Sequence, residues 1–76
     1  MPREQPQWII DRRRDLGDRV RRLRLNADHT QESFAELTGL DRRTLQRIEA
    51  GTSDPRYSDL LRIAAALDTR VSVIVD

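Results

Sequence analysis

The sequence contains no cysteine, and this absence removes several classes of protein from consideration. Disulfide-linked scaffolds, thiolate metal sites and cysteine nucleophiles all need a thiol. The longest apolar run spans five residues, far short of the roughly 20 that cross a bilayer. No secretory signal is evident near the N-terminus, and 76 residues allow one small domain. We therefore expect a single cytoplasmic domain that makes no contact with a membrane.

Residues that usually carry catalysis or hold cofactors are also scarce. His29 is the only histidine, whereas a metal site needs more ligands and a catalytic base needs a nucleophile nearby. With three glycines, the chain has no phosphate-cradling glycine loop, and none of its serines lies in a nucleophile-elbow context. The sequence therefore predicts no enzyme, no metal site and no bound cofactor.

Lysine is absent too, so all 14 basic residues are arginine. Arginine presents a planar fork that suits phosphate and guanine, although a GC-rich genome would favour arginine in any protein. Eight of the arginines fall in residues 3–24, against four acidic residues. The net charge of +1 indicates nothing by itself, so arginine use is only a weak sign of a polyanionic partner.

Hydrophobic patterning divides the chain into an arm at residues 1–10, a helical domain at residues 11–68 and an apolar end at residues 69–76. Two prolines in the arm argue against a helix before Pro6. The apolar residues 8–10 are expected to dock, either on the protein's own core or at a subunit interface. From residue 11 the pattern becomes helical, with an apolar stripe formed by Leu16, Val20, Leu23 and Ala27.

Two short helices joined by a glycine-containing turn occupy the centre of the chain, from about residue 31 to residue 50. Thr30 is placed to cap the first helix, and Gly39 suits a left-handed ending for it. Asp41 is placed to cap the second helix, residues 42–50, which stops at Gly51. This arrangement is typical of a helix-turn-helix.

A further helix is expected over residues 57–67, after a loop that ends near Pro55. The spacing of apolar residues in this helix and in the helix after Thr30 indicates which side chains face inward. The residues expected in the core are Phe34, Ala35, Leu37, Leu60, Leu61, Ile63, Ala64 and Leu67.

Within residues 20–67, a series of short elements follows a recognisable order and spacing. These elements are Thr30-Gln31-Glu32, Phe34-Ala35, Gly39-Leu40-Asp41, Thr44-Leu45, Arg47-Ile48-Glu49, Gly51, Pro55 and residues 60–67. Together they resemble the Cro/C1-type (XRE) helix-turn-helix family. The resemblance implies an all-α, five-helix, lambda-repressor-like DNA-binding domain. In one place the sequence departs from the family, which usually has a glycine and a hydrophobic residue where Asp28 and His29 stand.

The second helix of this motif, residues 42–50, has one polar and one apolar side. On a wheel that turns about 100° per residue, three arginines and a glutamine lie together, opposite Thr44, Leu45 and Ile48. A recognition helix needs such a division, because it touches base edges with one face and packs on its domain with the other. The resemblance implies that base contacts fall on Arg42, Arg43, Gln46 and Arg47. The alternative is an exposed charged helix held by surface pairs such as Arg43 with Glu36.

Other positions are expected to contact DNA phosphates or to brace the helix that reads the bases. Gln31 opens a helix, where free N–H groups and the helix dipole attract a phosphate. The resemblance further implies that Arg24 and Glu49 bridge the first helix to the end of the recognition helix, with Arg24 near the backbone of the DNA. The full set of phosphate-contacting or bracing residues is Thr30, Gln31, Thr44, Arg24 and Arg56.

The apolar end of the chain, VSVIV, is rich in β-branched residues that alternate, which predicts a short β-strand. A lone strand cannot satisfy its backbone hydrogen bonds, so we expect it to pair with the same strand of a second subunit. The alternatives are that VSVIV folds back on its own domain or pairs with residues 8–10. This arrangement is similar to that of the Hip-type antitoxins. The residues expected to form the dimer are Val71, Val73, Ile74 and Val75.

These observations favour a homodimeric transcriptional regulator, acting as a repressor, that binds a palindromic operator in double-stranded DNA. Such a regulator is expected to be cytoplasmic and associated with the nucleoid. Two other functions remain open. The protein can be an antitoxin that also binds a toxin and regulates its own operon, or a helix-turn-helix-derived module for protein interactions.

Overall fold

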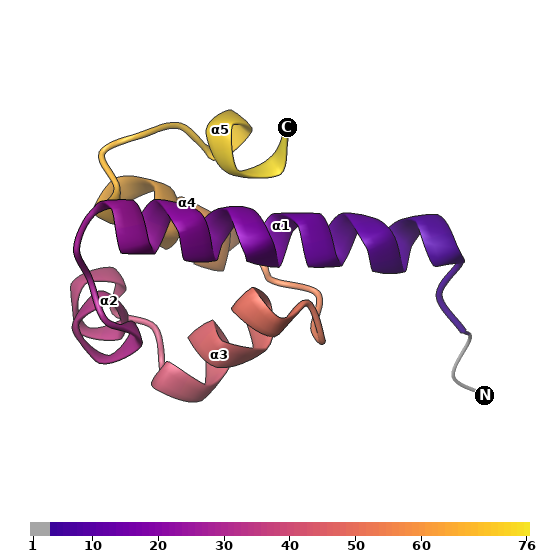
Figure 1. Ribbon diagram of the computed structural model, residues 1–76, viewed down its shortest axis with the longest axis horizontal. Coiled ribbons are helices and arrows are strands. Elements are labelled where there is room, and N and C mark those ends of the chain that lie inside the picture. Colours follow the sequence, from indigo (N-terminus) through magenta and orange to yellow (C-terminus); the bar gives the residue numbers. More distant parts are fainter. Residues whose placement is uncertain (1–3) are drawn as a thin grey trace.

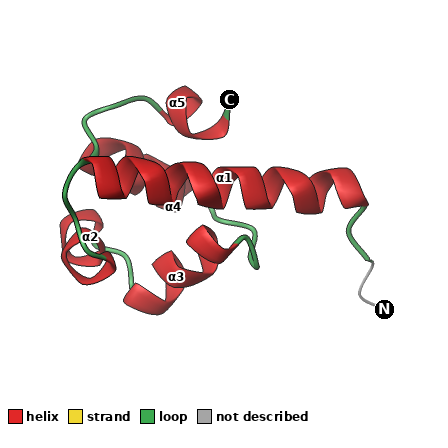
Figure 2. Cartoon of the chain, in the orientation of Figure 1, coloured by secondary structure: helices red, strands yellow, loops and turns green. Residues whose placement is uncertain are grey.

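The computed structural model describes residues 4–76, which form five helices and, over that range, no strand (Figure 1). The prediction of an all-α domain with five helices is confirmed. Figure 2 shows that short loops connect all of them. The helices are α1 (Gln7–Asn26), α2 (Gln31–Thr38), α3 (Arg42–Ala50), α4 (Tyr57–Ala66) and α5 (Val71–Val75).

The 20-residue helix α1 is the central element of the fold. In Figure 1, α2 and α3 lie on one side of α1 and α5 lies on the other. α1 packs chiefly against α3 and also contacts α5, while α4 packs against α2 and α5. None of the helices formed by residues 4–76 is both long and apolar enough to cross a membrane.

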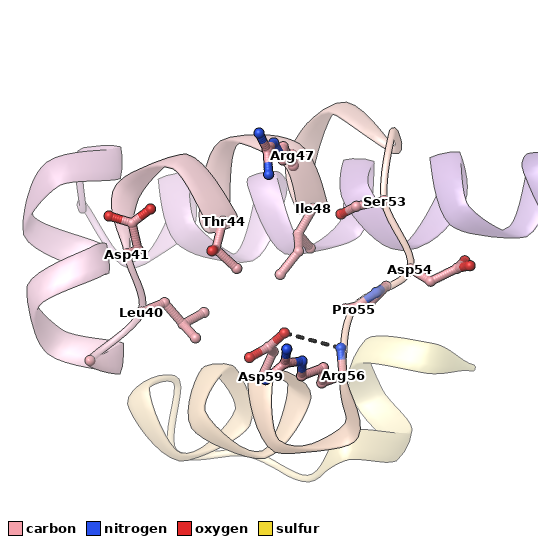
Figure 3. Close-up of a pocket in the computed structure, with 11 residues that line it drawn as sticks. Leu40, Asp41, Thr44, Arg47, Ile48, Ser53, Asp54, Pro55, Arg56 and Asp59 are labelled. Atoms are coloured by element: carbon pink, nitrogen blue, oxygen red, sulfur yellow. Dashed lines mark hydrogen bonds between the residues drawn. The ribbon is translucent and has the colours of Figure 1, made fainter.

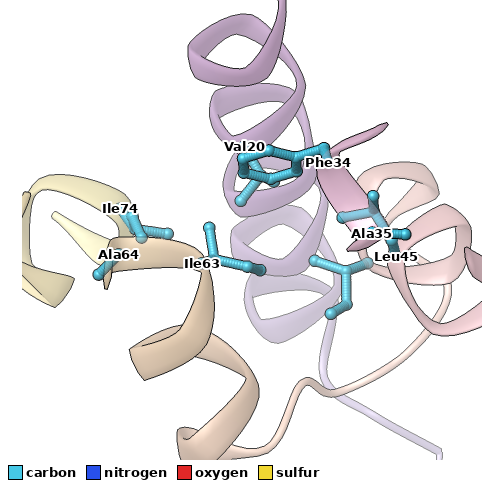
Figure 4. Packing of buried hydrophobic residues seen from close by; sticks show 8 residues of the cluster. Val20, Phe34, Ala35, Leu45, Ile63, Ala64 and Ile74 are labelled. Carbon is cyan, nitrogen blue, oxygen red and sulfur yellow. The ribbon is translucent and has the colours of Figure 1, made fainter. Parts of the chain in front are cut away.

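Each of the five helices places at least one fully buried side chain in a shared core (Figure 4). Burial of a large apolar side chain contributes about 1.5–3 kcal/mol, so even the short helices are fixed by the core. The six residues are Val20, Phe34, Leu45, Ile48, Ile63 and Ile74.

The N-terminal end of α1 starts earlier than the sequence pattern indicated. The helix begins at Gln7, directly after Pro6, so it runs through the expected boundary between residues 10 and 11. Pro6 suits this place, because its carbonyl oxygen accepts from the N–H groups of Ile9 and Ile10 at 3.0 and 3.2 Å. Trp8 is 67% exposed and does not dock on the core. The first three residues of the expected arm lie outside the described residues.

The corner between α1 and α2 accounts for the departure at residues 28 and 29. Asp28 has a φ of 62°, a left-handed conformation that aspartate tolerates better than most residues. It therefore fills the place where the resembled family usually has glycine. His29 stands at the usual hydrophobic position, and its ring lies 5.7 Å from that of Phe34.

The ends of α2 follow the expected pattern. The Oγ1 atom of Thr30 accepts from the N–H of Ser33 at 3.0 Å, and the N–H of Thr30 donates to Ser33 Oγ at 3.1 Å. This reciprocal capping box satisfies two backbone donors at the start of the helix. At the other end, Gly39 has a φ of 76°, where most other residues would be strained.

The expected β-strand at the C-terminus is wrong: residues 71–75 form the helix α5. The spacing of Val71, Ile74 and Val75 places these three on one helical face, and Ile74 is completely buried. Two arginines of α1 donate to carbonyl oxygens of this helix. The distances are 3.2 Å from Arg19 Nη1 to Ile74 O and 3.4 Å from Arg12 Nη2 to Val75 O. These tertiary contacts override the β-propensity of the segment.

Three apolar residues expected inside the core face outward. Leu37 is 53% exposed and Leu61 is 45% exposed, while Ala27 is exposed just beyond the end of α1. The polar residue Thr38 takes the inward place in α2, since its hydroxyl donates to Ala35 O at 3.1 Å. One apolar residue in α2, one in α4 and one at the end of α1 were therefore assigned to the wrong face.

Candidate nucleic-acid interface

The outer face of α3 carries the residues expected to contact bases. Leu45 and Ile48 are buried against the core and Thr44 is half-buried, so the opposite side of the helix faces solvent. All four expected base-contacting residues lie on that exposed side, namely Arg42, Arg43, Gln46 and Arg47. The apolar back therefore fixes the rotation of α3 about its own axis and points one amide and three guanidinium groups outward.

Ala50 shares this outer face and was missed in the sequence analysis. It is exposed, and on the helical wheel it falls between Gln46 and Arg43 at about 80° from Arg42. Its methyl group is small and uncharged, so nothing in its chemistry singled it out. The wheel itself would have placed it on the same face.

The arginines on this face are almost free of partners. Arg42 Nη1 lies 3.8 Å from Glu32 Oε1, and both side chains are more than half exposed. This separation is too long for a hydrogen bond. Among residues 4–76, neither Arg43 nor Arg47 forms an ion pair, and the alternative pair of Arg43 with Glu36 does not form. The guanidinium groups are therefore available to another molecule.

The C-terminal end of α3 is joined to α1 and α2 through Glu49. Its carboxylate accepts from Arg24 at two points, with Nε to Oε2 at 2.8 Å and Nη2 to Oε1 at 3.0 Å. Gln31 Nε2 donates to the same Oε1 at 3.2 Å. The remaining amino group of Arg24 donates to His29 O at 2.7 Å. Since the Arg24 and Glu49 side chains are 7% and 3% exposed, this is a buried and fully bonded pair.

A hollow of about 710 Å³ lies where α1 ends and where α2 and α3 begin. It brings together Thr30, Gln31, Arg24 and Arg42, although the hydroxyl of Thr30 is occupied in capping α2. The side chain of Arg24 is nearly buried and is paired with Glu49, so its guanidinium group is not presented at the surface of this hollow.

A second groove, of about 350 Å³, separates α3 from the start of α4 (Figure 3). Thr44 and Arg47 line it from α3, and Arg56 and Asp59 line it from the opposite side. The N–H of Arg56 donates to Asp59 Oδ2 at 3.0 Å, which caps α4. The exposed Arg56 side chain therefore stands across this groove from the outer face of α3.

Comparison with known proteins identifies the arrangement of α2 and α3. Residues 15–73 match the helix-turn-helix domain family, which is most of the chain. The chain belongs to the helix-turn-helix domain family. A comparison with curated protein sequences gives no significant match.

Two solved structures resemble this helix-turn-helix domain over most of their length. The restriction-modification controller protein C.AhdI from Aeromonas hydrophila is 32% identical, with a TM-score of 0.79, over 82% of this chain and 94% of the other. The hypothetical transcription factor NHTF from Neisseria is 29% identical, with a TM-score of 0.81, over 100% and 86%. The fold of the helix-turn-helix domain is therefore shared with a restriction-modification controller protein and a hypothetical transcription factor.

The residues expected to form a dimer do not act together in the helix-turn-helix domain. Ile74 is buried in the subunit's own core, so it cannot reach a partner without unfolding α5. Val71 and Val75 are half-buried beside it, while Val73 is 47% exposed. Of the four, only Val73 is exposed at the surface.

Proposed function

We propose that this protein binds double-stranded DNA in a sequence-specific way, as a homodimeric transcriptional regulator of the Cro/C1 type that acts as a repressor. The observation that carries the proposal is the outer face of α3, where three arginines and a glutamine are exposed. The same helix is pinned by buried apolar residues behind it. Helix α3 would lie in the major groove, whose width admits an α-helix.

The side chains of this face suit particular base edges. Arginine can donate two hydrogen bonds to O6 and N7 of guanine, and glutamine can pair with N6 and N7 of adenine. In helix-turn-helix recognition the N-terminal residues of the second helix reach the bases. We therefore rank Arg42 and Arg43 first, with Gln46 and Arg47 following one turn later.

The remaining expected contacts would hold the DNA backbone and set the register of α3. Gln31 lies in the first turn of α2, whose N–H groups attract phosphate. Arg56 would grip a phosphate beyond the groove between α3 and α4, with Thr44 as a spacer. Such contacts contribute affinity and orientation without reading the sequence.

A homodimer would present two copies of α3 about 34 Å apart, one turn of DNA, to a palindromic operator. The regulatory role is supported by the likeness to a restriction-modification controller protein and a hypothetical transcription factor. Such a regulator would work in the cytoplasm, on the nucleoid.

The two other candidate functions have less support. The hypothesis that the protein is an antitoxin depended on a C-terminal strand. Residues 71–75 are helical, so no observation favours a toxin as partner. A module for protein interactions has no need of three exposed arginines on the groove side of α3.

The base-contact assignment can be tested with a duplex selected from a random pool by the wild-type protein. Arg42→Ala and Arg43→Ala should each lose about 1–3 kcal/mol of binding free energy and relax specificity at one base pair. Arg70→Ala removes the same charge from an exposed site before α5 and should have little effect. The assignment fails if the Arg42→Ala/Arg43→Ala protein binds both the selected and a random duplex as tightly as the wild type.

The dimer proposal needs a separate measurement. Sedimentation velocity of the protein on the selected duplex should give a mass corresponding to two protein chains per duplex. A single chain bound to a non-palindromic selected sequence would contradict it.

A further inference from the structure

Beside the Arg24–Glu49 pair, α1 and the C-terminal end of α3 also meet through backbone atoms, at Gly17. Gly17 is buried at this crossing. A Cβ atom added there would lie 2.5 Å from Ile48 O and 2.6 Å from Glu49 O. Both are main-chain atoms and cannot rotate away, so an alanine would force the two helices apart by about 1 Å.

A second glycine repeats this contact one turn away. Gly51 ends α3 with a φ of 72°, and a Cβ atom there would lie 2.9 Å from Arg14 Cα and 3.2 Å from Arg14 N. Arg14, Gly17 and Arg24 share one face of α1, since they are separated by three and seven residues. Along this face, two glycine contacts and the Arg24–Glu49 pair hold the same end of α3.

We propose that Gly17 is a positioning residue for DNA recognition, because its missing side chain sets how closely α3 lies against α1. The inference rests on the proposed function and adds a specificity determinant that does not touch DNA. α3 rises about 12 Å from its first to its last residue. Moving its end by about 1 Å therefore tilts the helix by about 5°.

Such a tilt should affect the two classes of DNA contact differently. Hydrogen bonds to base edges weaken steeply outside a narrow range of distance and angle. Attraction between arginines and phosphates depends on counterion release and tolerates small displacements. Widening the contact at Gly17 should therefore reduce specificity more than it reduces general affinity for DNA.

The test compares Gly17→Ala with Ala64→Gly. Ala64 is buried in α4 beside Ile74, on the side of the core away from Leu45 (Figure 4), so Ala64→Gly lowers stability without separating α1 from α3. Binding of the selected and random duplexes is measured over a range of salt concentrations. For Gly17→Ala we expect the ratio of the two affinities to fall about tenfold. Its affinity for random DNA and its salt dependence should remain within about twofold.

Two results would overturn the inference. One is an unchanged ratio of the affinities for the selected and random duplexes in Gly17→Ala. The other is an equal fall of this ratio in Ala64→Gly. If Gly17→Ala is not folded by circular dichroism, Gly51→Asn carries the test, because asparagine tolerates a positive φ while adding a Cβ against Arg14. The same fall in the affinity ratio is expected there, and a wild-type ratio would overturn the inference.

A readout without DNA separates this inference from the proposed function. In the free Gly17→Ala or Gly51→Asn protein, amide chemical shifts along α3 should change more than those along α4, because α3 moves as a unit. Unchanged α3 shifts would overturn the positioning role even if the wild type binds its duplex specifically. Conversely, a wild type that selects no duplex would refute the proposed function while the shifts still report the contact.

Discussion

The two ends of α3 are attached to the rest of the protein in opposite ways. At the C-terminal end, Glu49 is bonded to Arg24 and Gln31, and Gly51 takes a left-handed conformation against α1. At the N-terminal end, Asp41 makes no side-chain capping bond. There the contact of Arg42 with Glu32 is long and exposed.

This difference leaves one end of α3 fixed to the domain and the side chains at its other end free to contact another molecule. The fixed end defines the direction of α3, because its partners are buried and fully bonded. The free end leaves the guanidinium groups of Arg42 and Arg43 exposed to solvent. If Arg42 formed strong hydrogen bonds or ion pairs within the protein, they would have to be broken before it could contact a base. Among the described residues, its side chain forms only the long and exposed contact with Glu32.

The largest expected effect comes from breaking the fixed end. Glu49→Ala leaves the buried Arg24 without its partner and should lower the free energy of unfolding by about 3–5 kcal/mol. Urea denaturation followed by circular dichroism measures this loss. The combined change Arg24→Met/Glu49→Leu should recover most of the stability, since neither charge is then buried alone. A loss below about 1 kcal/mol in Glu49→Ala would mean that this end is not fixed by the pair.

An intermediate effect should distinguish the caps of the two motif helices. Thr30→Ala removes the capping box of α2 and should lower the free energy of unfolding by about 1 kcal/mol. Asp41→Ala, the matched change at the start of α3, should cost much less because no side-chain bond is lost. Thermal denaturation of both variants makes the comparison. Equal losses would show that the start of α3 is capped as firmly as α2.

The smallest effect is expected from the exposed pair at the free end. Glu32→Gln should change the free energy of unfolding by less than about 0.5 kcal/mol. It should raise affinity for DNA by roughly threefold at low salt, because a carboxylate beside Arg42 no longer repels phosphates. Glu36→Gln, on the same helix but without an ion pair among the described residues, serves as the control. A weaker binding of Glu32→Gln would show that the pair prepares Arg42 for DNA.

Local signals in the sequence predicted most of the fold and the orientation of α3. Gly39 was expected to end one helix in a left-handed conformation and Gly51 to end the next helix, and both have a positive φ. The helical wheel separated the arginines of α3 from Leu45 and Ile48 because this helix has one apolar and one charged side. These features depend on neighbours within a few residues, which a sequence displays directly.

The features that were missed depend on residues far apart in the chain. VSVIV alternates like a strand, and only the pocket for Ile74 and the donors on Arg12 and Arg19 make a helix of it. Gly17 reads as a weak point in a helix, since glycine costs about 1 kcal/mol relative to alanine. The close helix contact that this glycine permits is apparent only when the backbone of residues 48 and 49 is placed against it.

The exposure of Trp8 has a practical consequence for following this protein in solution. It is the only tryptophan, it is 67% exposed and it lies in the first turn of α1, outside the matched region at residues 15–73. Its fluorescence should therefore hardly change when the core melts. A blue shift of its emission would instead signal that another molecule has covered the start of α1, which gives an intrinsic optical reporter of assembly that is separate from folding.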